Sequence, residues 1–267
     1  MSLSVDSAPQ ACQILSEGNA SFARLFDSDA PDDRIISVRE LTRGLGHDDR
    51  PAHHPFAAVI GCADARVPVE LIFSQTVNEL FVVRVAGNVL GQEVIGSIDY
   101  AVTAIPSVKL VVVLGHSGCG AMHAATGAYL DPTAFVGLAA EHQLRSIVSQ
   151  LYPSIRLAHS ALIETRGPEI EQHPSFAQVL GEVSIVVNAA VMASMMRSEL
   201  NAYDTEVEAR FAIYDLASHC VGIPQRAGQA EAYHGLVPPP VDAAALTALA
   251  YDIADGEHVD GLLGRGD

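Results

Sequence analysis

Two short segments of the sequence combine side chains that bind metals with side chains that carry charge. Cys62, Asp64 and Arg66 follow the apolar run AAVIG, whereas His116 and Cys119 follow the apolar run LVVVLG. Two thiolates and one imidazole are a ligand set for Zn²⁺, and three protein ligands leave the fourth tetrahedral position for water or substrate. The residue types therefore predict a catalytic zinc site rather than a structural one.

The two apolar runs have the composition and length of short buried strands that end at glycine. In a parallel sheet the carboxyl ends of neighbouring strands lie side by side, at the edge where such folds bind ligands. We therefore expect Cys62 and His116 to converge, although they are 54 positions apart and far outside zinc-finger spacing. We also expect Cys119 at the start of a helix, where free N–H groups stabilise a thiolate.

Alternating strand and helix patterns surround these segments and predict an α/β fold with a central, mostly parallel β-sheet flanked by helices. Strands are expected at 56–61, 80–85 and 108–114, with a strand or hairpin at 211–223. Helices are expected after Pro68, at 93–105, from about 118, and at 137–150, 154–166 and 174–202.

The α/β domain is expected to span residues 55–224, between an N-terminal helical arm with its connection (1–54) and a C-terminal extension (225–267). Apolar residues at helical spacing in 8–26 predict an amphipathic arm, and a short helix is expected near 37–44. The composition changes at Pro224, and three prolines at 238–240 precede a short helical segment. We expect this extension to be partly ordered or to pack on a partner subunit.

Composition narrows the class of protein. The chain has 267 residues, 49% of them hydrophobic, and no apolar run approaches the roughly 20 residues of a membrane span. Its net charge of −17 argues against nucleic acid or an anionic membrane as partner. No basic patch precedes an apolar stretch near the N-terminus, so a cytoplasmic location is expected. Four widely spaced cysteines then favour metal binding or catalysis over disulfides.

Four motifs, in order along the chain, resemble the β-class carbonic anhydrases. They are Cys62-x-Asp64-x-Arg66, FVVRVAGN at 81–88, SIDYAV at 97–102 and GHSGCG at 115–120, with weaker likeness at EGN (17–19) and YDL (214–216). The resemblance implies a zinc enzyme that interconverts carbon dioxide and bicarbonate. It also implies that Cys62, His116 and Cys119 ligate the metal and that Asp64 and Arg66 form an adjacent dyad.

The chemistry of the residues agrees with this resemblance. Zinc lowers the pKa of a bound water toward about 7 and supplies a hydroxide near neutral pH. Asp64 would accept a hydrogen bond from it, and Arg66 would keep that carboxylate ionised. In some relatives this aspartate becomes a fourth ligand in a closed state, a role the resemblance extends to Asp64. Relatives that close with bicarbonate carry a tryptophan where this chain has Val59, so that regulation is not implied.

The resemblance also implies an apolar substrate pocket, built partly across a dimer interface. Its residues correspond to Phe81, Ala86 and Tyr100, which plain core packing would equally explain. His53 stands where many relatives carry a substrate-contacting glutamine. A neutral imidazole can make the same hydrogen bond or relay protons, whereas the simpler interpretation is an exposed loop residue.

The family further implies a homodimer or a pair of dimers, and we expect the N-terminal arm to wrap the neighbouring subunit. Proton export after hydration needs a carrier, for which His53, His54 and His123 are candidates. His123, one turn after Cys119, is expected to face the core or solvent.

Two other functions remain open at the level of sequence. The same scaffold hydrolyses carbonyl sulfide or carbon disulfide in some relatives, and these linear, apolar molecules would use the same ligands. A zinc-binding sensor without turnover is the alternative from a different class. An intact Asp64–Arg66 pair argues against the sensor, because a purely structural zinc needs no such dyad.

Overall fold

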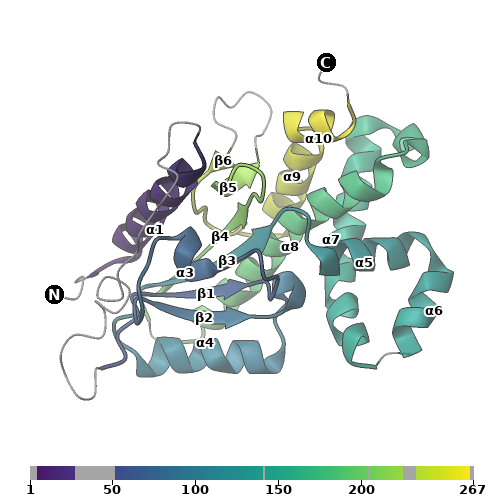
Figure 1. Ribbon diagram of the computed structural model, residues 1–267. Helices are drawn as coiled ribbons and strands as arrows, with labels where there is room; N and C mark the ends of the chain where they lie inside the picture. The colour runs from purple at the N-terminus through teal and green to yellow at the C-terminus, as the bar shows by residue number, and fades with distance from the viewer. Residues whose placement is uncertain (1–4, 28–51, 141, 204, 225–232, 265–267) are drawn as a thin grey trace.

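The computed structural model describes residues 5–27, 52–140, 142–203, 205–224 and 233–264. The short helix expected near 37–44 lies outside these residues. Within them, the strands form a six-stranded sheet in the order β2-β1-β3-β4-β5-β6 (Figure 1). The strands are β1 (Ala57–Gly61), β2 (Leu80–Arg84), β3 (Leu110–His116), β4 (Glu208–Tyr214), β5 (Val221–Pro224) and β6 (Tyr233–His234).

The sheet confirms the predicted parallel architecture. β2, β1, β3 and β4 run parallel, whereas β5 pairs antiparallel with β4 and β6 pairs antiparallel with β5. The strand or hairpin expected at 211–223 is β4 followed by β5. In the register of β1 and β3, Gly61 lies opposite Leu114, so Cys62 and His116 emerge at one edge of the sheet.

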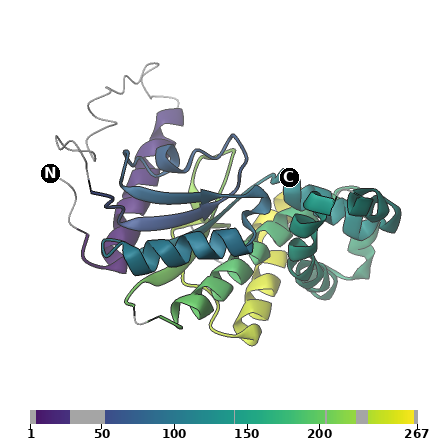
Figure 2. The ribbon, with the colours of Figure 1, turned by 90° about the horizontal axis from the view of Figure 1, so that it is seen from below.

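Helices cover both faces of the sheet (Figures 1 and 2). The α-helices are α1 (Ala8–Ala23), α3 (Val69–Ile72), α4 (Gln92–Ala104), α5 (Gly120–Leu130), α6 (Pro132–Ala140), α7 (His142–Arg166), α8 (Phe176–Leu200), α9 (Ala243–Ala254) and α10 (Glu257–Leu262). Short 3₁₀ turns are η1 (Arg24–Phe26), η3 (Ala86–Asn88) and η4 (Pro168–Gln172).

Alternation along the strands explains the two layers. Ala57 and Val59 of β1 pack with α1 and α3, whereas Ala58 and Ile60 pack into the larger core with α4, α5, α7, α8 and α9. Because successive side chains of a strand point to opposite faces, a strand covered on both faces must be apolar throughout. The unbroken apolar runs of β1 and β3 meet this requirement, and every residue in both strands is buried.

The N-terminal arm packs on its own chain. Ala8, Ala11 and Leu15 of α1 are buried against the sheet, and buried Asn19 donates to the carbonyls of Ile72 and His219. That the arm also wraps a neighbouring subunit stays a prediction. The apolar face of α1 is already covered within the same chain.

The helices that follow the metal loop also differ from expectation. A break was expected before Pro153, but α7 runs unbroken from His142 to Arg166 through it. Leu151 and Ile155, on either side of the proline, are fully buried. Packing of this apolar face outweighs the backbone hydrogen bond that proline removes, because tertiary context routinely overrides helix propensity.

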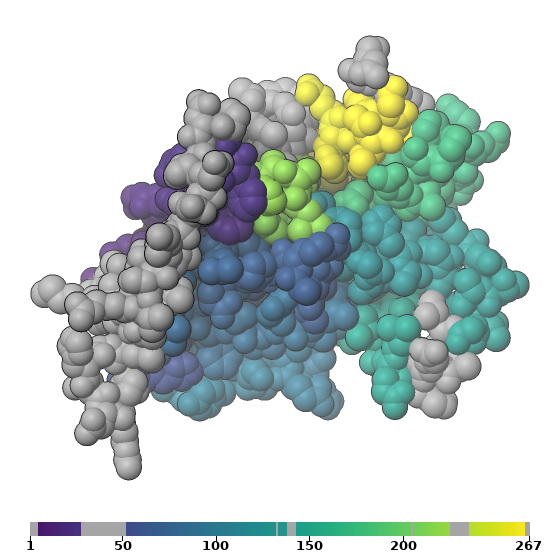
Figure 3. Space-filling view, in the orientation of Figure 1, coloured from purple at the N-terminus to yellow at the C-terminus, as the bar shows by residue number. Residues whose placement is uncertain are grey.

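The C-terminal segment completes the core of the same chain rather than standing apart. Leu249 and Ile253 of α9 and Val259 of α10 are buried in the larger core. Arg166 of α7 donates to the carbonyls of Ala254 and Gly256 between these two helices. In the space-filling view, α9 and α10 (yellow) and α1 (purple) flank the light-green segment around β5 (Figure 3).

Helix α8 runs through the centre of the molecule. It is long and apolar enough to cross a membrane, with a mean hydropathy of 1.7 over its most apolar window. However, 83% of that window is buried inside the protein. A central core helix has the same composition as a membrane span, so this helix gives only weak evidence for a membrane.

Candidate metal centre

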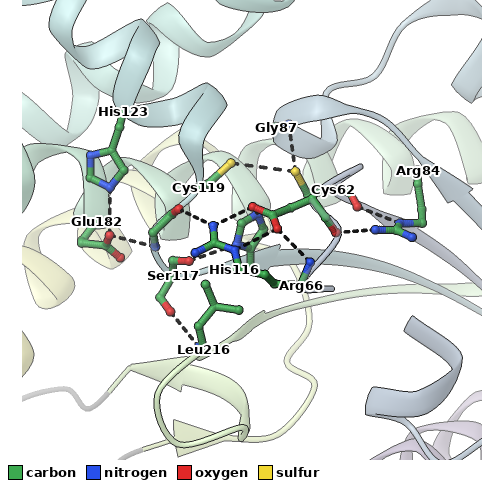
Figure 4. A network of polar contacts seen from close by, with 12 residues as sticks. Cys62, Arg66, Arg84, Gly87, His116, Ser117, Cys119, His123, Glu182 and Leu216 are labelled. Atoms are coloured by element: carbon green, nitrogen blue, oxygen red, sulfur yellow. Dashed lines mark hydrogen bonds and ion pairs between the residues drawn. The ribbon is translucent and has the colours of Figure 1, made fainter. Parts of the chain in front are cut away.

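Three candidate ligand side chains meet where β1 and β3 end. One ligand atom from each of Cys62, His116 and Cys119 lies within 4.8 Å of the other two, and all three residues are buried. The sulfurs of Cys62 and Cys119 are 4.0 Å apart and face each other (Figure 4). The convergence predicted from strand order is confirmed.

The imidazole of His116 is oriented for a ligand. Its Nδ1 lies 3.0 Å from the carbonyl oxygen of Ser117. Because a carbonyl oxygen can only accept a hydrogen bond, Nδ1 carries the proton and donates it. Nε2 is buried and has no hydrogen-bond partner among the described residues. A buried polar atom without a partner is costly, and a metal-ligating histidine commonly donates its second nitrogen to a carbonyl. The ring therefore presents a free lone pair to the sulfurs.

The two thiols differ in acidity because they interact with each other. A hydrogen bond from Cys119, helped by the backbone N–H of Gly87, lowers the pKa of Cys62, while the same contact, together with burial, raises that of Cys119. Two sulfurs this close hold one negative charge readily but not two. A cation between them would allow both to ionise, so the donor set and its charge fit Zn²⁺.

Asp64 and Arg66 form a pair beside the sulfurs and the imidazole. Arg66 Nε donates to Asp64 Oδ1 at 3.0 Å and Nη2 donates to Oδ2 at 2.7 Å, a two-pronged contact. These hydrogen bonds hold the pKa of Asp64 far below its ordinary value. Asp64 Oδ2 also lies 3.9 Å from Nε2 of His116. The pair thus stands at the open side of the cluster with its carboxylate ionised.

Backbone contacts fix the loop that carries Cys62. Arg84, at the end of β2, donates from Nε to the carbonyl of Cys62 at 2.9 Å and from Nη2 to the carbonyl of Asp64. The backbone N–H of Gly87 points to the Cys62 sulfur at 3.4 Å. Gly87 has a φ of +68°, which glycine adopts without strain, and its carbonyl accepts from Asn188 of α8.

Three of the four expected pocket residues form a row of rings along the β2 edge. The rings of His53 and Phe81 lie 5.8 Å apart, and those of Phe81 and Tyr100 lie 6.4 Å apart. Tyr100 is 54% exposed. Ala86 lies in η3, directly before Gly87. The structure therefore brings the aromatic residues together at the edge of the sheet.

Several contacts around the cluster had no clear signal in the sequence. Glu182 of α8 accepts hydrogen bonds from the backbone of Gly118 and from His123, which was expected to face the core or solvent. Asp215 accepts from Ser117 and lies within the YDL segment. The roles of Glu182 and Arg84 depend on how distant segments pack, and no short-range spacing indicates them.

Comparison with known proteins agrees with this site. Residues 57–218, more than half of the chain, match the sequence model of the carbonic anhydrase family. Carbonic anhydrase 2 of Mycobacterium tuberculosis is 41% identical over 179 residues, which cover 66% of this chain and 79% of that protein. A carbonic anhydrase of Mycolicibacterium smegmatis is 44% identical over 149 residues, covering 53% of this chain and 66% of its own.

The fold also has a counterpart among solved structures. The β-carbonic anhydrase CcaA superposes with a TM-score of 0.50 at 20% identity, covering 75% of this chain and 90% of that one. A parallel sheet with Cys, His and Cys at its carboxyl edge defines the class of protein, an α/β protein with a candidate zinc centre. The chain belongs to the carbonic anhydrase family, in its β class.

Proposed function

We propose that this protein catalyses the reversible hydration of carbon dioxide to bicarbonate and a proton, with zinc held by Cys62, His116 and Cys119. The free, buried Nε2 of His116 facing two sulfurs carries the proposal. Bound zinc would supply an activated water for attack on the carbon of carbon dioxide. The side chains around it then determine how that water and the substrate are held.

Asp64 and Arg66 would orient the reacting water. Because Arg66 keeps Asp64 ionised, its Oδ2 can only accept a hydrogen bond, and it lies 3.9 Å from Nε2 of His116. Because two hydrogen bonds from Arg66 already fix the Asp64 carboxylate, it can hold the water in one orientation with little further loss of side-chain entropy. A contact of Asp64 with the metal itself, in a closed state, would first require the pair with Arg66 to break.

We propose that carbon dioxide binds beside this pair, in a pocket that includes Phe81, Ala86 and Tyr100, with His53 as a hydrogen-bonding residue. The row of rings along the β2 edge supports this assignment. β2 ends the sheet and Tyr100 is half exposed, so the pocket is incomplete in one subunit. A homodimer or dimer of dimers that covers this edge is part of the proposal.

A cytoplasmic location is also proposed, and the free state of all four cysteines supports a reducing compartment. Hydrolysis of carbonyl sulfide or carbon disulfide is the competing activity on the same scaffold. Stopped-flow hydration of carbon dioxide by protein of measured zinc content, with carbonyl sulfide as competitor, tests the proposal. Turnover of carbon dioxide that scales with zinc would support it. Turnover of carbonyl sulfide alone, or of neither, would reject it.

A further inference from the structure

The dipeptide between two of the candidate ligands has its own set of fixed contacts. Ser117 and Gly118 link His116 to Cys119, so their conformation sets where both ligand atoms point. Gly118 has a φ of +63°, and the backbone N–H of Ser117 donates to the carbonyl of Tyr214. A turn this tight leaves backbone groups that need partners from outside the strand and the helix it joins.

Asp215 holds the first residue of the dipeptide. Its Oδ1 accepts from the hydroxyl of Ser117 at 2.9 Å, and that hydroxyl accepts from the backbone of Leu216 at 2.9 Å. Asp215 Oδ2 accepts from both the backbone and the hydroxyl of Ser218. Burial raises the pKa of Asp215, but these hydrogen bonds outweigh it and keep that pKa below its ordinary value. The brace on this side is an ionised carboxylate.

Glu182 holds the second residue from α8. A single oxygen, Oε1, accepts from the backbone N–H of Gly118 at 2.9 Å and lies 3.0 Å from Nε2 of His123 (Figure 4). Gly181 makes room for the imidazole, because a Cβ there would lie 2.6 Å from the His123 ring. The Glu182 side chain is only 11% exposed.

The other end of Gly118 is bound to the Asp64–Arg66 pair. Arg66 Nη2 donates to the carbonyl of Gly118 at 3.2 Å. Glu182 and Arg66 therefore hold the N–H and the C=O of one residue, and a shift of Gly118 would move the arginine that orients Asp64. The hydrogen bond from Gly118 to Glu182 of α8 therefore affects the positions of both the candidate metal ligands and the Asp64–Arg66 pair.

We propose that Glu182 and Asp215 are positioning residues, two carboxylates that brace Ser117 and Gly118 and so direct His116 Nε2 and Cys119 Sγ toward one metal. This inference rests on the proposed metal site but not on the identity of the substrate. Partners that orient metal ligands typically change metal affinity by about 10- to 100-fold when they are removed. The brace should therefore be visible in metal binding as well as in catalysis.

The test compares Glu182→Ala and Asp215→Ala with the isosteric Glu182→Gln and Asp215→Asn. Glu199→Gln, an exposed carboxylate on the same helix, is the matched control. For each full-length protein, zinc affinity is measured by competition with a chelator. The ligand-field absorption spectrum is recorded after cobalt(II) substitution, and kcat and KM are measured for carbon dioxide.

We expect each alanine variant to bind zinc about 10-fold or more weakly, to change the cobalt spectrum and to lose kcat more than it raises KM. The amide variants keep an acceptor oxygen and should recover most of the affinity and the spectrum. Folded alanine variants with unchanged affinity and spectrum would overturn the brace. If they fail to fold, Glu182→Asp, which is one methylene too short to reach Gly118, is judged by the same two measurements.

The two proposals can fail separately. If the unaltered protein hydrates no carbon dioxide but the alanine variants still lose metal affinity, the brace stands and the proposed activity does not. If the protein is active and the variants bind metal normally, the brace is wrong and the activity stands.

Discussion

Oδ2 of Asp64 lies 3.9 Å from Nε2 of His116, although neither atom is bonded to the other. The carboxylate is paired with Arg66, and the imidazole nitrogen has no partner among the described residues. A cation bound to Nε2 of His116 would therefore lie beside the ionised carboxylate of Asp64, which Arg66 holds in place. This spacing gives Asp64 a role in orienting water while leaving the three candidate ligands to bind the metal.

Replacing Asp64 with asparagine tests that separation of roles. Asp64→Asn should retain zinc, because it leaves the three candidate ligands in place, but lower kcat/KM by about tenfold or more, since an amide accepts less strongly and loses the two-pronged contact with Arg66. Stopped-flow hydration and metal analysis of the same preparation measure both effects. An unchanged rate would remove Asp64 from the mechanism.

Replacing Cys62 with serine tests ligation. Cys62→Ser should lose most of its zinc, because a serine hydroxyl does not ionise to replace a thiolate near neutral pH. Cys220→Ser is the control, since Cys220 lies outside the cluster and its sulfur donates to the carbonyl of Ser218. Elemental analysis after dialysis gives the result. A full zinc complement in Cys62→Ser would contradict ligation by this residue.

The parts of this site that can be predicted from the sequence are those that depend on residues close together along the chain. The unbroken apolar runs before Cys62 and His116 are enough to predict two buried parallel strands and a shared edge. Glu182 reaches Gly118 from a helix 64 residues further along the chain, and no local pattern encodes that distance. For the same reason, the break expected at Pro153 was wrong, because packing against α8 determines the course of α7.

The C-terminal helices provide a prediction about stability. The sequence predicted an extension that is partly ordered or packs on a partner subunit, and in the structure Arg166 donates to Ala254, Gly256 and Asp260 around the turn between α9 and α10. Arg166→Met should lower the free energy of unfolding by about 2 kcal/mol or more, because charged hydrogen bonds are lost and buried carbonyls stay unpaired. Urea unfolding measures this loss. Arg24→Met, at an exposed arginine of η1, should have little effect.

His258 of α10 gives the protein a dependence on pH. Burial lowers the pKa of His258, and the negative charges of Glu182 and Asp215 oppose this only in part. The native state then binds the proton less readily than the unfolded chain. The contribution of neutral His258 to the free energy of unfolding is therefore fully present above the unfolded pKa of about 6.5 and is lost as the pH drops below it.

His258→Gln removes this titration. Its free energy of unfolding should decline less than that of the unaltered protein between about pH 7 and about pH 5.5. The exposed His54→Gln is the control for a histidine-to-glutamine change elsewhere on the chain. Equal slopes for His258→Gln and the unaltered protein would show that another group causes the acid sensitivity.

Two glycines test how α1 packs on the end of α3. A Cβ at Gly18 of α1 would lie 1.9 Å from the backbone oxygen of Phe73, whereas one at Gly96 of α4 would meet nothing within 4 Å. Gly18→Ala should destabilise the protein by about 1–3 kcal/mol, since backbone cannot move aside as a side chain can. Gly96→Ala should stabilise it by about 0.5–1 kcal/mol, because alanine favours a helix. Thermal unfolding that ranks the two variants in the opposite order would contradict the docking.

The burial of α8 has a consequence for how the chain is made. The surfaces that cover this apolar helix include β4 and α9, and both come after it in the sequence. A chain synthesised through α8 but not yet through α9 therefore exposes the part of this apolar helix that β4 and α9 cover. Such partial products should be prone to self-association. Synthesis of α9 would then be the step that completes the cover of α8 and removes this tendency.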